Sequence, residues 1–167
     1  MLNSPLRQQL SAIGVPDERI NKAQILCLPE NILRTAKREE LRETTDATIL
    51  IKQLREKSVE VFSLFDVGLD LPAVDRRAKD KWLGTVWVRD YAAMPILTSL
   101  IAGYLVLEFP VHFGKASEQN VHLDLVVGEK DEKISLKYAG DGQTLVRVLD
   151  AIKDDKGNHD RPARGHH

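Results

Sequence analysis

The chain has one cysteine, few aromatic residues and almost no net charge. Cys27 is the single cysteine among 167 residues, so a disulfide within the chain is excluded. It lies in the apolar run 25–28, where a buried and unreactive thiol is expected. Aromatic residues make up 5% of the sequence, so a core must be mainly aliphatic. The 24 basic and 25 acidic residues nearly cancel, which excludes a general electrostatic attraction to nucleic acid.

Motifs for catalysis, cofactors and metals are also missing. The five histidines are His112, His122, His159, His166 and His167. None has a second ligand at a spacing typical of a metal site. Residues 140–142 read Gly-Asp-Gly, which lacks the further residues of a dinucleotide or phosphate loop and predicts a turn. The sequence therefore predicts a non-enzymatic protein with no cofactor and no metal.

The first 67 residues are predicted to be mainly helical. Apolar residues recur there at helical spacing, with capping residues or glycine at several boundaries. The expected helices are 5–13, 17–28, 30–42 and 47–57. A strand is possible at 59–65, because most of these residues are apolar. Residues 68–81 combine glycine, proline and many charges and are predicted to form a linker, with a capped short helix as the alternative.

A long uncharged run at residues 91–107 dominates the middle of the chain. A helix that spans a membrane needs about 20 apolar residues, with a lower limit of about 17. The run is at that limit, and its extension to 91–109 includes Glu108. We therefore expect a membrane anchor within segment 82–113, with membrane lipid as a partner.

Residues on both sides of this run have the character of a membrane interface, where aromatic and basic side chains gather. The residues predicted to lie there are Trp82, Trp87, Arg89, Tyr91 and Phe109. Basic residues are concentrated before the run, and Lys115 is the nearest one after it. The positive-inside rule then places the N-terminus in the cytoplasm.

Pro95 supports the alternative of a buried core helix. Proline removes a backbone donor and favours the first turn of a helix, so a helix that begins there is too short to span a membrane comfortably. The chain would then be a soluble, cytoplasmic α+β domain. Ser99 and Gly103 form a small-xxx-small pair that would let two such apolar helices approach closely, which predicts a helix–helix contact.

The C-terminal part predicts a ββα unit at residues 119–153. Apolar and polar residues alternate in 121–127 and again in 134–138, which is typical of a hairpin with one apolar face. A helix is expected at 143–153, followed by a disordered tail at 154–167. Two strands are marginally stable alone, so this unit should pair with another strand, another protein or a second copy.

These patterns together predict an α+β chain with a helical N-terminal region, one apolar and transmembrane helix, and a small C-terminal ββα unit. The function that fits is a single-pass membrane-anchored adaptor or regulator that acts through protein–protein interaction. A homo-oligomer or a protein partner is expected, and no nucleic acid. The alternative is a soluble α+β interaction domain with 91–107 as its buried helix.

Overall fold

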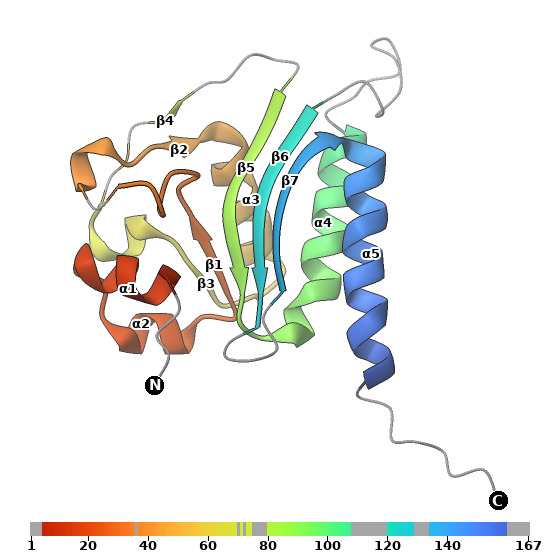
Figure 1. The fold of residues 1–167 in the computed structure, drawn as a ribbon, viewed down its shortest axis with the longest axis horizontal. Coiled ribbons are helices and arrows are strands. Elements are labelled where there is room, and N and C mark those ends of the chain that lie inside the picture. Colours follow the sequence, from red (N-terminus) through yellow and green to blue (C-terminus); the bar gives the residue numbers. More distant parts are fainter. Residues whose placement is uncertain are drawn as a thin grey trace, which may run out of the picture.

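The computed structural model describes residues 5–35, 37–69, 71, 73–74, 80–107, 120–128 and 134–159. Its centre is a five-stranded mixed sheet in the order β3-β1-β5-β6-β7 (Figure 1). The strands are β1 (Ile25–Leu28), β3 (Val61–Phe62), β5 (Asp80–Val88), β6 (Asn120–Val127) and β7 (Ile134–Asp141). β1 and β5 run antiparallel, as do β6 and β7, whereas β5 and β6 are parallel. The α+β class is therefore confirmed.

Three helices cover one face of the sheet (Figure 1). They are α3 (Thr45–Glu56), α4 (Met94–Leu107) and α5 (Gly142–His159). The core beneath them is mainly aliphatic, as the composition predicted. It includes Leu54 of α3, Leu97 of α4 and Leu149 of α5, each completely buried.

A second apolar cluster covers one end of the opposite face. It is formed by α1 (Pro5–Ala12), α2 (Asp17–Lys22) and the loop after β1, which pack on Leu26, Trp87 and Val126 of the sheet. The remaining elements are η1 (Arg38–Glu40), β2 (Glu43–Thr44), η2 (Leu64–Val67), β4 (Ala73–Val74) and η3 (Tyr91–Ala93). β2 and β4 form a separate two-stranded sheet.

The helix predicted at 17–28 is confirmed only as far as Lys22, and the helix predicted at 30–42 is wrong. α2 ends at Lys22, and the four residues of β1 are all buried in the sheet. A short run that is apolar on both faces has no period that separates a strand from a helix. In the second segment the Asn31 side chain donates to the Glu40 carbonyl (2.8 Å) and accepts from the Arg42 amide (3.3 Å). These bonds hold a turn in place of a helix.

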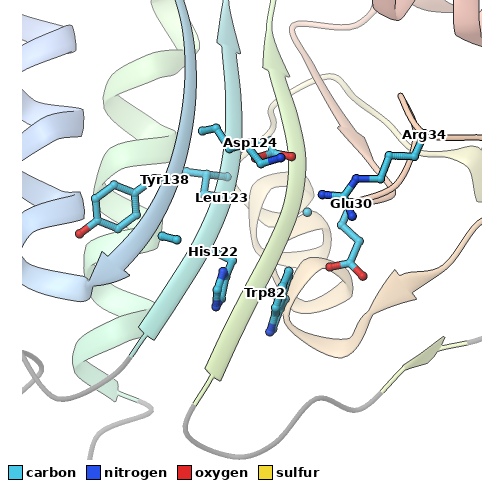
Figure 2. Close-up of a pocket in the computed structure, with 10 residues that line it drawn as sticks. Glu30, Arg34, Trp82, His122, Leu123, Asp124 and Tyr138 are labelled. Carbon is cyan, nitrogen blue, oxygen red and sulfur yellow. The ribbon is translucent and has the colours of Figure 1, made fainter.

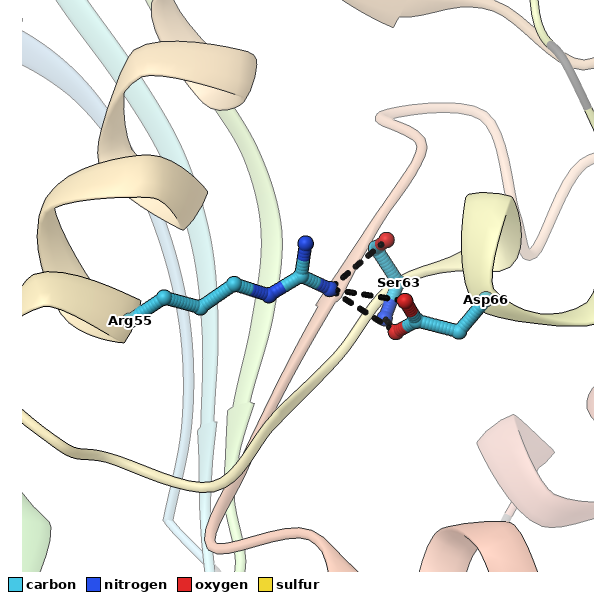
Figure 3. A network of polar contacts seen from close by, with 3 residues as sticks. All are labelled: Arg55, Ser63 and Asp66. Atoms are coloured by element: carbon cyan, nitrogen blue, oxygen red, sulfur yellow. Dashed lines mark hydrogen bonds and ion pairs between the residues drawn. The ribbon is translucent and has the colours of Figure 1, made fainter.

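The strand predicted at 59–65 is shortened to β3 by a local capping network (Figure 3). The Ser63 amide donates to Asp66 (2.9 Å), which forms a capping box at the start of η2. Arg55 of α3 then donates to both carboxylate oxygens of Asp66, each at 2.9 Å. The predicted linker 68–81 also ends early, because β5 begins at Asp80.

The membrane-anchor prediction is wrong. Among the residues that the structure describes, no helix has both the length and the apolar composition needed to cross a membrane. α4 has 14 residues, because Tyr91–Ala93 form a separate 3-10 turn and the α-helix starts just before Pro95. Leu97 and Ile101 of α4 are completely buried in the helix-covered core. The cytoplasmic position of the N-terminus was inferred from the charges beside a membrane span. Without such a span, that inference has no support.

The hairpin and the helix after it lie where alternation predicted them. β6 and β7 pair over eight residues in one continuous register, and β6 also pairs with β5. The ββα segment thus shares its sheet with β1 and β3. α5 continues to His159, so the predicted tail begins too early; residues 160–167 lie outside the described part.

Cys27 is expected to be inert while the protein is folded. It lies in β1, and burial raises the pKa of its thiol to about 12, with a smaller contribution from Glu43. Because the thiolate is the reactive form, a disulfide reagent at pH 8 should label Cys27 only when the chain unfolds. Labelling should be complete in denaturant and slow without it. Rapid labelling of the native protein would contradict this buried position.

Candidate functional site

A groove of about 220 Å³ lies on the sheet face opposite α4 and α5, beyond the end that α1 and α2 cover (Figure 2). Residues from the loop after β1 and from three adjacent strands line it. They are Glu30, Arg34, Trp82, Gly84, His122, Leu123, Asp124, Lys137, Tyr138 and Ala139. Most are polar, in contrast to the apolar cluster at the other end of this face.

A β-bulge in β5 directs Trp82 into the groove. Trp82 pairs with His122, but the next regular pair is Thr85 with Asp124, so the register shifts between them. The extra residue sends Leu83 into the helix-covered core and Trp82 to the opposite face. Gly84 makes this possible with a φ of 78°, at a point where a Cβ atom would lie 2.8 Å from the Leu28 carbonyl oxygen.

Trp82 and His122 form an aromatic stack in the groove. Their ring centroids are 3.8 Å apart and their planes differ by 8°. The rings come from neighbouring parallel strands, and both residues are half-buried. Figure 2 shows them side by side at one end of the groove. The stack offers an apolar and aromatic surface beside charged groups.

Asp124 is at the centre of the groove's charged groups. Lys137 lies directly opposite it on β7. Partial burial raises the pKa of Asp124, and the nearby Glu30 carboxylate adds to this. The positive charges of Lys137 and Arg34 act in the opposite direction. Two acidic and two basic side chains therefore surround one groove.

The groove is lined mainly by charged and aromatic side chains. Its described lining residues include no serine, threonine or cysteine that could act as a nucleophile. In the part of the chain that the structure describes, no cluster of three or more histidine, cysteine or acidic residues could hold a metal ion. The arrangement is suited to binding through charge and aromatic contact.

The outer edge of β7 is the second exposed feature beside the groove. β7 is the last strand of the sheet, and within the described ranges no strand pairs with its outer edge. Ile134, Leu136 and Tyr138 face the helix-covered core but are only partly buried. Their partners on β6 are 0–1% exposed. The apolar side chains on the helix-covered face are therefore more exposed on β7 than on β6.

The residues predicted to lie at a membrane interface have other positions. Trp87 is completely buried, and its indole donates to the Gly128 carbonyl (3.0 Å). Arg89 donates to the carbonyls of Ile20 (2.7 Å) and Ala23 (3.1 Å) at the end of α2. These contacts join the sheet to α2.

The other predicted interface residues are divided between the groove, the helices and the part not described. Trp82 lines the groove, and the Tyr91 hydroxyl donates to the Ile152 carbonyl of α5. Phe109 lies outside the described residues. Ser99 and Gly103 lie exposed on the outer side of α4, and no atom lies within 4 Å of a Cβ placed on Gly103. Their predicted helix–helix contact stays a prediction.

The sequence located two of the three strands of the groove, β6 and β7, but not β5, which was assigned to the linker 68–81 and to the membrane-anchor segment 82–113. The convergence of the three strands was not predicted. His122 was expected on the polar face of a strand, and that alternation also included Asp124 and Lys137. Glu30 and Arg34 were assigned to a helix, so nothing pointed to their place beside the sheet. One feature of the sequence could have indicated that Trp82 faces the groove. Gly84 is an isolated glycine within an apolar strand, and such a glycine indicates a bulge.

Comparison with known proteins does not assign a family. No family model matches the chain. Searches of curated proteins and of solved structures likewise find no match. The functional argument therefore rests on the groove and on the β7 edge.

Proposed function

We propose that this chain is a non-enzymatic interaction domain that joins a second copy of itself through the outer edge of β7. The observation that carries the proposal is the partial burial of Ile134, Leu136 and Tyr138 beside fully buried partners on β6. An additional strand at this edge would cover that apolar row. It would also satisfy the backbone groups that a terminal strand presents outward.

The shape of β7 supports strand pairing. It forms eight consecutive residue pairs with β6 without a bulge, so its outer edge is long and regular. Natural edge strands are commonly protected by proline, by bulges or by several charges. β7 contains no proline, and its charged residues are Lys137 and, at its end, Asp141. Such an edge is a suitable template for another strand.

The residues of β7 favour self-pairing in one register. In an antiparallel pair, residues directly opposite point to the same face of the sheet. A two-fold axis at Leu136 places Ile134 opposite Tyr138 on the helix-covered face. On the other face it places Ser135 opposite Lys137, without like charges. An axis at Lys137 would bring two lysines together, which is unfavourable.

Changes at Ser135 test this dimer because the residue is exposed. Ser135→Lys places lysine opposite Lys137 twice in each dimer. Each like-charged pair costs about 0.5–1 kcal/mol, so the dissociation constant should rise by roughly fivefold to thirtyfold. The matched variant Ser135→Glu creates two opposite-charge pairs and should lower it. Sedimentation equilibrium over a concentration series measures both.

Thermal melting of both variants provides the control for the fold. A protein that stays monomeric at all concentrations would contradict the proposal. Equal dissociation constants for Ser135→Lys and Ser135→Glu would contradict the register. High salt should reduce the difference between the two variants, because the introduced charges are exposed.

A further inference from the structure

The groove has features that pairing through β7 does not use. Trp82, His122 and Asp124 come from β5 and β6, away from the outer edge, and Glu30 and Arg34 come from the loop after β1 (Figure 2). The bulge at Gly84 that directs Trp82 outward requires a positive φ and a close backbone contact. Bulges of this kind occur often beside functional sites, where they re-aim a side chain.

The charges of the groove restrict the ligand. Glu30 and Asp124 would repel an anion such as a phosphate, and Arg34 and Lys137 would repel a simple cation. A ligand with one positive and one negative group can satisfy both sets. Its ammonium group would donate to the carboxylates, and its carboxylate would accept from the guanidinium or ammonium groups.

The volume of the groove and its aromatic stack restrict the ligand further. A volume of about 220 Å³ is below the range of about 300–1,000 Å³ that is usual for drug-sized ligands. It suits a small molecule and not a nucleotide. The Trp82–His122 stack offers a surface that aromatic groups contact favourably.

We propose that the groove binds a small zwitterion, namely an α-amino acid with an aromatic side chain. Asp124 and Glu30 hold its ammonium group, Lys137 and Arg34 hold its carboxylate, and its ring packs beside Trp82 and His122. This inference rests mainly on residues of β5, β6 and the loop after β1, and Lys137 is the residue that it shares with the proposed β7 pairing.

Three related probes test the proposal in the full chain. Phenylalanine carries both charges, phenylalaninamide only the positive one, and N-acetylphenylalanine only the negative one. The chain has two tryptophans, so its ¹⁵N spectrum has two indole signals, and Trp82→Phe assigns them. Trp87 is buried and bonded to Gly128, so its signal is an internal control.

Phenylalanine should shift the Trp82 signal and leave the Trp87 signal in place. It should bind about tenfold more tightly than either probe with one charge, because each of those loses a charge-assisted hydrogen bond. Asp124→Asn should remove the preference over N-acetylphenylalanine. Lys137→Gln should reduce the preference over phenylalaninamide. Both side chains are at least partly exposed, and thermal melting checks the fold of each variant.

Two results would overturn the proposal. One is a Trp82 signal that does not move with phenylalanine at millimolar concentrations. The other is equal binding of all three probes, which would show that the charges of the groove do not select the ligand. Repeating the titration of the unaltered chain at protein concentrations above and below the dissociation constant of the dimer separates the two proposals. Ligand binding should persist at the low concentration, where the chain is monomeric.

Discussion

Gly84→Ala is expected to lower the free energy of unfolding by about 2–4 kcal/mol and to displace Trp82. Gly84 has a φ of 78°, which costs a residue with a side chain about 1–3 kcal/mol. The new Cβ atom would also lie 2.8 Å from the Leu28 carbonyl oxygen, so β1 and β5 would have to move apart. Denaturant unfolding measures the loss, and the Trp82 indole signal reports the change in the groove.

Gly68→Ala is the matched control for this substitution. Gly68 has a similar φ of 81°, but no atom lies within 4 Å of a Cβ placed there. It should therefore show the conformational cost alone, about 1–3 kcal/mol, without the cost of the close contact. A loss at Gly84 no larger than the loss at Gly68 would mean that the close approach to Leu28 is unimportant. The bulge would then not depend on glycine.

Asp46→Ala is expected to cost about 3 kcal/mol of stability. Asp46 lies in the first turn of α3 and accepts hydrogen bonds from the Trp82 amide (2.9 Å) and the Tyr104 hydroxyl. Its carboxylate is also 3.8 Å from the Lys81 ammonium. The Lys81 and Asp46 side chains are only 13% and 15% exposed, so removal of the carboxylate leaves a poorly solvated positive charge.

The exposed ion pair between Arg7 and Asp17 provides the comparison. Their charged atoms are 3.4 Å apart, and the Asp17 side chain is 74% exposed. Asp17→Ala should change the free energy of unfolding by about 0.5 kcal/mol or less, because water screens the pair. If Asp46→Ala has an equally small effect, Asp46 does not hold α3, β5 and α4 together. Urea unfolding of both variants decides this.

The contacts of the Asp46 carboxylate also link the stability of the fold to the groove. The Trp82 amide donates to Asp46 immediately before the bulge, so this bond helps to fix where the bulge begins. If the contacts of Asp46 are weakened, the Trp82 indole signal should broaden more than the Trp87 signal. Tyr104 of α4 donates to the same carboxylate, so the helix first interpreted as a membrane anchor helps to position the groove.

Local patterns in the sequence determined several parts of this protein. Alternation of apolar and polar residues was sufficient to locate β6 and β7, because over most of each strand one face is more buried than the other. The spacing of Leu145 and Leu149 similarly predicted α5, and both residues are completely buried. The α+β class and the aliphatic core also followed from the sequence.

Only the tertiary structure decided the role of the fully apolar segments. Residues 25–28 and 91–107 have no polar face, so their periodicity does not show what covers them. β1 is buried between two strands with apolar clusters on both faces, whereas α4 packs one side on the sheet and its neighbouring helices and leaves Ser99 and Gly103 exposed on the other. A membrane and a protein core remove apolar surface from water equally well, and hydropathy alone does not separate them.

The groove likewise depended on contacts between distant residues. Glu30 and Asp124 are far apart in the chain, and strand order and register bring them together. The direction of Trp82 depends on a single extra residue in β5, because a shift of one position moves a side chain to the opposite face. The sequence supplied the charges and the rings, and the pairing of β5 with β6 placed them in one groove.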